Sequence, residues 1–273
     1  MITLSSDFGS PYPAAMKGVL LERTDSRLVD VAHDFPRGDI RASAFWLREV
    51  LPYYPPATHL VVVDPGVGTD RHAIVVRAGD HVLVGPDNGV LLPVAQRLAG
   101  QGGDGHDGAF ADALDVFRVD EDGLETPVPT GSESADGSTT FHGRDVFAPA
   151  AAAVESRRVS LDQLSWSSPL ESPVEYRLPA AEVSDERVAG EVLVVDDFGN
   201  LITNVPGTVL EDVTEIVANG DRIPVGDAFA TVHPGERVAL VGSHGNVELD
   251  VNDGRGDDAF GLEAGDDVVL EWV

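Results

Sequence analysis

Cysteine is absent from the 273 residues, which excludes disulfide bonds, thiolate nucleophiles and zinc–thiolate sites. No run of 18 apolar residues occurs, so we expect no membrane-spanning helix. The opening residues lack the basic flank and long apolar stretch of a signal peptide, and we therefore expect a cytoplasmic protein. Hydrophobic residues still make up 42% of the chain, enough for one large core or two ordinary ones.

Positive charge is also scarce. The chain has 18 basic residues against 47 acidic ones, a formal net charge of −29, and its single lysine is Lys17. Such a chain repels phosphate backbones, so we expect no nucleic-acid partner. The acidic residues are scattered rather than gathered at motifs, which favours a surface adapted to high salt over a dedicated cation-binding protein.

Strand and helix patterns alternate along the first part of the chain. Residues 59–63 form a continuous apolar run, typical of a strand buried on both faces. Asp39 precedes a helical pattern and is a candidate N-cap. This alternation predicts an α/β domain with a mostly parallel sheet. The predicted strands are 2–4, 28–31, 59–63, 73–77 and 81–85, the last two as a hairpin, and the predicted helices are 14–28, 39–51 and 90–98.

The composition changes at 101–138, which is rich in Gly, Asp, Ser, Glu and Pro. We expect exposed loops there around a weak strand near 114–119, with a mobile stretch at 131–138. Helix-forming sequence returns at 141–154.

The pattern after residue 178 is entirely β. A Pro- and Ser-rich stretch at 165–178 reads as a linker, which predicts domains 1–178 and 179–273. Asn219-Gly220 is the strongest short hairpin signal in this half. The pattern predicts a small all-β domain, either a sandwich or a barrel. Its predicted strands are 190–195, 200–205, 214–218, 222–225, 237–241, 247–251 and 268–272.

Polar side chains follow several apolar strands of the first domain. Asp7, Asp64, Asp87 and Asn88 each come just after a predicted strand. Ligands of open α/β sheets bind at that edge, although a single Asp there ordinarily caps a helix or forms a turn. Both interpretations remain open from the residues alone.

Two motifs are more specific. Two glycines and a proline between Asp64 and Arg71 predict a rigid turn, from which Arg71 can fold back onto Asp64 as a charge-assisted pair. His142 precedes an alanine-rich helix that Asp145 could cap. The structural alternatives are an ion pair that braces a loop and a capped helix start with an incidental histidine.

The second domain offers polar turns. The Asp196-Asp-Phe-Gly-Asn200 segment invites comparison with protein kinases, but the phosphate loop, catalytic loop and strand lysine of kinases are missing. The residues therefore leave two enzyme classes open. One is a metal-free hydrolase or transferase acting on a polar small molecule. The other is a metallohydrolase with a divalent ion held by Asp7, Asp64, His142 and Asp196.

Seven segments, in this order, resemble the S-adenosyl-L-methionine (SAM) hydroxide adenosyltransferase family, a relative of the fluorinase and chlorinase enzymes. The resemblance implies an N-terminal α/β domain, a C-terminal barrel-like domain, and a homotrimer with substrate between neighbouring subunits. It also implies that water splits SAM into adenosine and L-methionine, without a metal ion or other cofactor. The segments are 2–9, 16–18, 62–68 with Arg71, 85–89, 140–145, 196–200 and 243–252.

The resemblance assigns the nucleophile pocket to Asp64, Arg71 and His142, which surround a water in the hydrolases. The halogenases have Tyr at the Asp64 position and Ser or Gly at the His142 position, so this chain favours water over halide. We expect Asp64 to orient the water, Arg71 to favour its hydroxide character, and His142 to accept its proton.

The remaining substrate contacts also follow from the resemblance. Asp7 should hold the ribose hydroxyls, and Asn200 should contact adenine with Phe229 stacked on it. Asp196 and Ser243 should hold the amino and carboxylate ends of methionine, and Asn252 belongs to the same substrate-binding set. His244 departs from the family, because the halogenases place an Arg there. A sensor that binds adenosine or SAM without turnover is an alternative of a different class.

Overall fold

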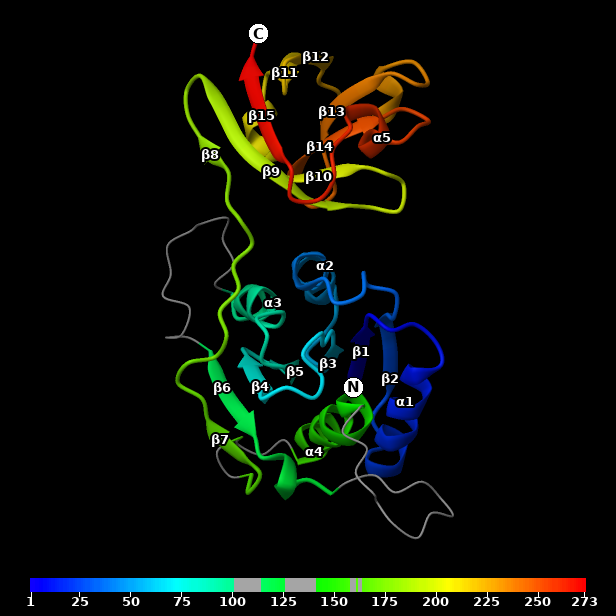
Figure 1. The fold of residues 1–273 in the computed structure, drawn as a ribbon, viewed down its shortest axis with the longest axis vertical. Coiled ribbons are helices and arrows are strands. Elements are labelled where there is room, and N and C mark those ends of the chain that lie inside the picture. Colours follow the sequence, from blue (N-terminus) through cyan, green and yellow to red (C-terminus); the bar gives the residue numbers. More distant parts are fainter. Residues whose placement is uncertain (101–113, 126–140, 158–160, 162–163) are drawn as a thin grey trace. The chain divides into compact units, whose positions relative to one another are not determined.

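The computed structural model describes residues 1–100, 114–125, 141–157, 161 and 164–273 (Figure 1). It divides into two compact units, Met1–Arg177 and Leu178–Val273. Each unit is built on its own β-sheet. The stretch 131–138, expected to be mobile, lies outside the described residues.

The N-terminal unit contains a seven-stranded sheet in the order β2-β1-β3-β5-β4-β6-β7. Neighbours from β2 to β5 are parallel, whereas β4, β6 and β7 join as antiparallel neighbours. The α/β prediction is confirmed, and the sheet is mixed because the β4–β5 hairpin reverses the chain. The strands are β1 (Ile2–Ser6), β2 (Leu28–Ala32), β3 (Thr58–Val62), β4 (Ala73–Ala78), β5 (His81–Pro86), β6 (Asp115–Val119) and β7 (Ser167–Pro169).

Helices cover both faces of this sheet. Leu60 and Val62 of β3 point into the core formed with α1 and α4, whereas Val61 and Val63 pack with α2 and α3 (Figure 1). Burial on both sides explains the unbroken apolar run of β3. The helices are α1 (Tyr12–Arg23), α2 (Ile40–Val50), α3 (Leu92–Leu98) and α4 (Ala148–Arg157), with short 3-10 turns at Leu51–Tyr53 and Glu121–Gly123.

The structure confirms the predicted N-cap of α2 but not the whole of the predicted linker. Asp39 is the N-cap of α2, and its side chain accepts the backbone N–H of Ala42 at 2.9 Å, as predicted. The linker prediction was wrong for Ser167–Pro169, which pairs with β6 as an edge strand. Three residues of β structure give too short a pattern to recognise within a Pro- and Ser-rich stretch.

The C-terminal unit confirms the barrel-like all-β prediction. Its strands pair antiparallel in the order β12-β11-β15-β9-β10-β14-β13, and β8 pairs with β9. A bridge between Val225 and Ala239 brings the two ends of this path together, so the barrel is nearly closed. The strands are β8 (Glu182–Val183), β9 (Arg187–Val195), β10 (Leu201–Pro206), β11 (Glu215–Ala218), β12 (Asp221–Pro224), β13 (Arg237–Val241), β14 (Asn246–Val251) and β15 (Asp267–Trp272).

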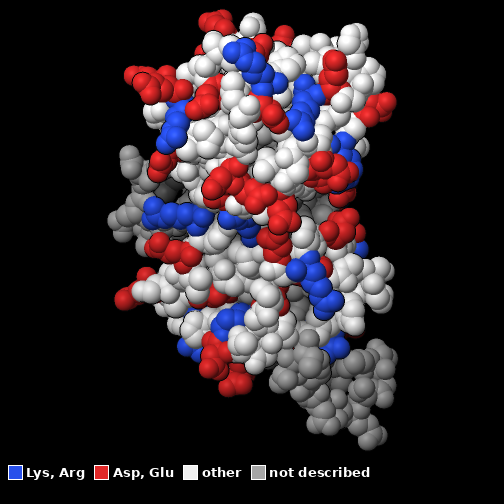
Figure 2. Space-filling view, turned by 45° about the horizontal axis from the view of Figure 1, so that its top comes forward, with Lys and Arg blue, Asp and Glu red and all other residues white. Residues whose placement is uncertain are grey.

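This barrel encloses an apolar core of Val, Leu, Ile and Ala side chains. A short helix, α5 (Gly256–Phe260), was not predicted, and 3-10 turns occur at Gly207–Leu210 and Phe229–Thr231. Within the described parts of the chain, no helix has the length and apolar character needed to cross a membrane. Acidic side chains are distributed over the face drawn in Figure 2, with basic side chains between them.

Candidate active site

A tight turn after β3 brings Asp64 and Arg71 together. The hydroxyl and backbone N–H of Thr69 both donate to the Gly66 carbonyl, at 2.7 and 3.1 Å, and reverse the chain. A Cβ on Gly66 would lie 3.2 Å from Cγ of Arg71, so glycine leaves room for the returning side chain. Arg71 then donates from Nε to Oδ1 of Asp64 at 2.9 Å and from Nη2 to Oδ2.

His142 completes this cluster. Nη2 of Arg71 lies 2.7 Å from Nδ1 of His142. A guanidinium only donates hydrogen bonds, so Nδ1 is the acceptor and the proton of the neutral ring sits on Nε2. The side chains of Asp64 and Arg71 are only 2% and 9% exposed, which strengthens the electrostatic contacts between them.

A π-helical turn at Gly143–Phe147 follows His142 and runs close to β3, since a Cβ on Gly143 would lie 3.2 Å from Cγ1 of Val62. A Cβ on Gly143 would lie 2.9 Å from Sδ of Met16, so the turn approaches α1 closely. Phe147, at the end of the turn, stacks under the guanidinium of Arg71, with Cζ 4.9 Å from the ring centroid. Such π-turns are frequent at functional sites.

Asp145 does not cap the helix, contrary to expectation. Its carboxylate instead accepts two hydrogen bonds from Arg144, at 2.6 and 2.8 Å. The π-turn changes the direction of this side chain, which a pattern of ordinary helical spacing cannot predict.

One donor of Arg71 remains unused. Its Nη1 atom is buried and has no hydrogen-bond partner among the described residues. An unsatisfied buried donor on a charged group costs free energy, about 1–3 kcal/mol or more. Nη1 can therefore donate to an acceptor atom that enters the site.

Asp7 lies at the same edge of the sheet. It follows β1, the parallel neighbour of β3, and its Oδ2 accepts the backbone N–H of Gly38 at 2.7 Å. A Cβ on Gly38 would lie 3.5 Å from Cβ of Pro65. The Gly38 segment thus lies between Asp7 and the Asp64 turn.

Asp87 and Asn88 hold backbone rather than an open site. Asn88 donates to the Val63 carbonyl at 2.9 Å and accepts from the backbone N–H of Val90 at 3.2 Å. Oδ1 of Asp87 accepts the backbone N–H of Val174 at 2.8 Å. Burial raises the pKa of Asp87 overall, although this hydrogen bond and nearby positive charge act in the opposite direction.

An aromatic trio that the sequence analysis did not single out joins the Asp7 and His142 segments. The rings of Phe8, Tyr12 and Phe141 pack edge to face, with centroids 5.5–6.0 Å apart. Phe8 follows Asp7 and Phe141 precedes His142, so this contact couples the two segments mechanically. Aromatic residues make up only 6% of the chain, so the aromatic neighbours of Asp7 and His142 were a signal that the sequence analysis could have used.

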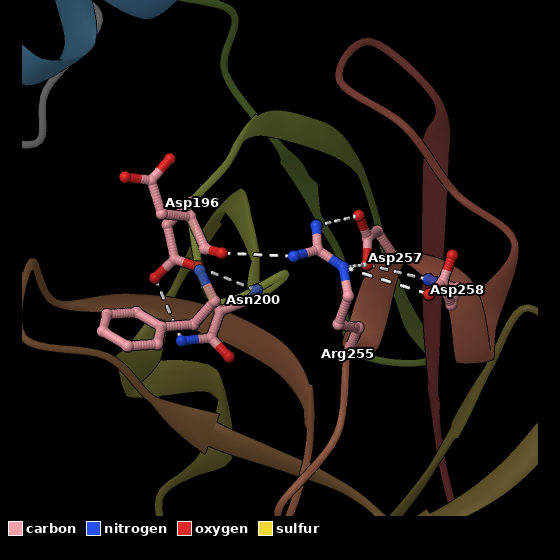
Figure 3. Close-up of polar contacts among 7 residues, drawn as sticks. Asp196, Asn200, Arg255, Asp257 and Asp258 are labelled. Carbon is pink, nitrogen blue, oxygen red and sulfur yellow. Dashed lines mark hydrogen bonds and ion pairs between the residues drawn. The ribbon is translucent and has the colours of Figure 1, made fainter. Parts of the chain in front are cut away.

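In the C-terminal unit, Asp196 organises the turn between β9 and β10 (Figure 3). Its Oδ1 accepts the backbone N–H groups of Phe198 and Asn200, both at 2.9 Å, and Oδ2 accepts Nδ2 of Asn200 at 3.0 Å. The tight-turn interpretation is therefore right. Asn200 keeps its Oδ1 and one amide proton available for another partner.

Arg255 braces this turn from the side of α5, as Figure 3 shows. It donates to the Asp197 carbonyl at 3.1 Å and forms a bidentate ion pair with Asp257, with hydrogen bonds of 2.6 and 3.0 Å. The backbone N–H of Asp257 also donates to the Gly199 carbonyl at 2.9 Å. This support was missed because α5 was not predicted.

Glu248 and Asp250 on β14 form a second feature that the sequence reading missed. Both are buried, and neither oxygen of Asp250 has a hydrogen-bond partner among the described residues. Burial, and then the charge of Asp196, raise the pKa of Glu248 to about 7. Burial, and then the charges of Glu248 and Asp196, raise the pKa of Asp250 to about 8, and the backbone N–H of Leu201, which approaches without good hydrogen-bond geometry, opposes this only weakly.

The other expected substrate contacts are more dispersed. Phe229 is 41% exposed, Ser243 lies in the turn between β13 and β14, and Asn252 donates to the Val232 carbonyl at 2.7 Å. Within residues 178–273, hydrogen bonds join Asp196 to Asn200 but do not join Phe229, Ser243 or Asn252 to that pair.

The metal alternative finds little support in this geometry. Both oxygens of Asp64 accept hydrogen bonds from Arg71, which competes with metal ligation. Across the described ranges, no group of three or more His, Asp or Glu residues is arranged to hold a metal ion.

Comparisons with known proteins identify relatives. Two family models match, described as the SAM hydroxide adenosyltransferase N-terminal domain, over 2–165, and C-terminal domain, over 190–269. A Salinispora tropica protein named (R)-S-adenosyl-L-methionine hydrolase is 38% identical over 274 residues, covering 97% of this chain and 95% of its own. A Thermus thermophilus protein of the same name is 41% identical over 270 residues, covering 95% of each.

Solved structures are similar over the whole chain. An uncharacterized conserved protein from Thermotoga maritima gives a TM-score of 0.79 at 28% identity, covering 99% of each chain. A conserved hypothetical protein from Thermus thermophilus gives a TM-score of 0.71 at 35% identity, covering 100% of this chain and 99% of its own.

Proposed function

We propose that this chain, which belongs to the SAM hydroxide adenosyltransferase family, hydrolyses SAM to adenosine and L-methionine. The observation that carries the proposal is the hydrogen-bonded Asp64–Arg71–His142 chain, in which one buried guanidinium donor is unused among the described residues. An anionic or strongly polarised oxygen fits that donor, and attack by such an oxygen is what the reaction needs.

The chemistry requires a positioned nucleophile and no general acid. Water attacks the 5′ carbon of the ribose, the carbon–sulfur bond breaks, and both of its electrons remain on sulfur as the neutral thioether of methionine. One water proton is released, and the other stays on the new 5′ hydroxyl. The protein must hold the oxygen in line with the breaking bond and stabilise its developing charge.

In this proposal Arg71 donates from Nη1 to the attacking oxygen and favours its hydroxide character. Asp64 fixes the guanidinium by two contacts, a geometry that lysine cannot reproduce. His142 was expected to accept the water proton. Because its Nδ1 already accepts from Arg71, we now assign it to orienting the guanidinium and presenting an Nε2 proton to the pocket.

The substrate-binding assignments remain proposals. Asp7 would hold the ribose hydroxyls with the carboxylate oxygen that Gly38 leaves free. Asn200 and Phe229 would contact adenine, Asp196 and Ser243 would hold the methionine portion, and Asn252 would belong to the same substrate-binding set. The exposed ring of Phe229 and the free amide atoms of Asn200 are suited to those roles.

The test is product identity. Purified protein incubated with SAM should release equal amounts of adenosine and L-methionine. Release of methylthioadenosine would reject the proposal. An intact ligand that stays tightly bound through long incubation would favour the sensor alternative instead.

The form of the substrate can be tested in the same assay. The relatives' name specifies (R)-SAM, and a sulfonium sulfur with three different substituents is a stereocentre. We propose that this chain prefers the (R) form. Separated sulfonium epimers should be consumed at different rates, and equal rates would overturn the preference.

We further propose that the reaction needs no metal ion or other cofactor and takes place in the cytoplasm. Activity should survive exhaustive chelation, because Arg71 supplies the positive charge at the nucleophile. Loss of activity on chelation, with recovery on adding a divalent ion, would restore the metallohydrolase alternative.

The assembly expected from the family is a homotrimer in which neighbouring subunits share a site. A charge of −29 on each chain opposes such assembly when screening is weak. The Debye length falls from about 30 Å at 0.01 M salt to about 3 Å at 1 M. Light scattering and turnover on one salt series should therefore rise together, and an active monomer would contradict a shared site.

A further inference from the structure

Four polar side chains, from β1, α1, β2 and the residue that follows β2, form a continuous hydrogen-bonded chain. Ser6 Oγ lies 2.7 Å from His33 Nδ1, and His33 Nε2 lies 3.0 Å from Asp30 Oδ1. Lys17 Nζ donates to the other Asp30 oxygen at 2.6 Å. We call this set the Ser6–Lys17 relay. It lies outside the Asp64–Arg71–His142 cluster and has no part in the chemistry described above.

The backbone register explains how the relay forms. β1 and β2 pair Leu4 with Asp30, then skip one residue so that Ser5 faces Ala32. Continuing this shifted register sets Ser6 opposite His33. Irregularities of this kind are common next to active sites, where they change the direction of a side chain.

His33 holds the chain on both sides of Asp7. Its ring contacts the buried Ser6 hydroxyl on one side, and its carbonyl accepts the backbone N–H of Gly9 at 2.7 Å on the other. Asp7 lies between these two anchors, and its Oδ2 is bound to Gly38. One histidine therefore restrains the backbone that carries the Asp7 carboxylate.

At the charged end of the relay, the Asp30 carboxylate binds the His33 ring. Burial alone would raise the pKa of Asp30, but hydrogen bonds and charge from Lys17 and His33 lower it overall. The ionised Asp30 carboxylate thus holds Nε2 of His33, while Nδ1 of the same ring contacts the Ser6 hydroxyl. Lys17 is the single lysine in a chain that otherwise uses arginine, and it is bound to this carboxylate.

We infer that His33 is a positioning residue that, through the Ser6–Lys17 relay, fixes Asp7 for recognition of a ribose with both hydroxyls intact. The inference rests on the proposed ribose-binding role of Asp7. It adds that discrimination between ribose and deoxyribose depends on a residue that does not itself touch the substrate.

The test uses adenosine and 2′-deoxyadenosine as probes of binding to the full chain, measured by calorimetry. His33→Ala should weaken adenosine binding by about threefold to tenfold, the scale of a lost hydrogen bond, and leave 2′-deoxyadenosine within about twofold. With SAM, KM should rise by a similar factor while kcat changes little. His233→Ala, at an exposed histidine of the C-terminal unit, is the matched control and should change neither.

Conservative variants separate positioning from folding. His33→Asn retains an acceptor near the Nδ1 position and should restore most adenosine affinity, whereas His33→Gln reaches towards Asp30 and should restore less. In an Asp7→Ala background, His33→Ala should have almost no further effect on adenosine binding. This non-additivity is the signature of two residues acting as a unit.

The outcomes are distinct. Equal weakening of both nucleosides by His33→Ala, or fully additive effects with Asp7→Ala, would overturn the inference. Unchanged adenosine binding in Asp7→Ala alone would overturn it as well, because the relay acts through Asp7. If SAM is not hydrolysed but adenosine binding shows the predicted pattern, the proposed reaction fails and the inference stands.

Discussion

In the N-terminal unit the buried carboxylate of Asp64 is held at both oxygens by Arg71, whereas the buried carboxyls of Glu248 and Asp250 in the C-terminal unit have no ion-pair partner among the described residues. Asp250 consequently keeps its proton to about pH 8. The paired arrangement would, in the proposed reaction, supply a fixed field for the attacking oxygen, and the unpaired arrangement titrates near neutral pH. Pairing thus determines whether a buried acid is a constant part of a site or a variable one.

The largest expected effect comes from breaking the paired arrangement. Arg71→Ala should lower turnover by roughly 10²–10⁴, because the attacking oxygen loses its donor and Asp64 loses its partner. Asp64→Asn and His142→Ala should fall in the same range. Arg71→Lys should not restore activity, since an ammonium cannot make the bidentate contact with Asp64.

Two controls make this result interpretable. Arg222→Ala removes an exposed arginine paired with Glu215 and should leave turnover unchanged. Adenosine affinity of the Arg71 variants should stay within about threefold, because a hydrogen bond to water does not hold the nucleoside. Near-wild-type turnover in all three cluster variants would mean that the chemistry lies elsewhere.

A smaller effect is expected from the unpaired arrangement and appears as pH-dependent stability. The pKa of Asp250 rises from 3.8 to about 8 on folding, so the folded state binds more protons between those values. The free energy of unfolding therefore falls as pH rises through this window. Glu248 contributes in the same direction only up to about pH 7.

Asp250→Asn isolates one member of this pair. Urea unfolding at constant high salt should show a loss of stability between about pH 7 and 8 in the wild type and a flatter profile in the variant. An unchanged slope in Asp250→Asn would mean that this carboxyl is not the buried proton carrier.

The smallest effect concerns the support of the paired arrangement. Asn88→Ala removes the hydrogen bond to the Val63 carbonyl, next to Asp64, and should cost about 1 kcal/mol of stability. Turnover should fall only a few-fold. Asn246→Ala is the control and should leave stability nearly unchanged. Urea unfolding measures the free energy of unfolding of both variants. Full stability in Asn88→Ala would show that the end of β3 is held without it.

Much of the nucleophile-side geometry could be predicted from the sequence. Glycines and a proline between Asp64 and Arg71 indicate a tight turn, and a turn of that length returns Arg71 to the carboxylate. The alternation of strands and helices places Asp7 and Asp64 at one edge of the sheet. These inferences succeed because each depends on local spacing or on one general rule of sheet topology.

The features that were missed depend on non-local packing. Glu248 and Asp250 alternate with apolar residues along β14, a pattern that predicts a solvent-facing side. The structure buries both instead, with Gly242 packed against Glu248 and Gly256 packed against Asp250. The choice of ring nitrogen in His142 likewise depends on an arginine 71 residues away in sequence, and no local pattern encodes it.

The central claim is tested most directly by single-turnover hydrolysis of SAM in oxygen-18 water, comparing wild type with Arg71→Ala. The account predicts one labelled oxygen at the 5′ hydroxyl of adenosine in the wild type. It also predicts a rate at least about 100-fold lower in the variant, with adenosine affinity preserved. Unlabelled adenosine, or an equally fast Arg71→Ala enzyme, would contradict the assignment of Arg71 as the group that activates water.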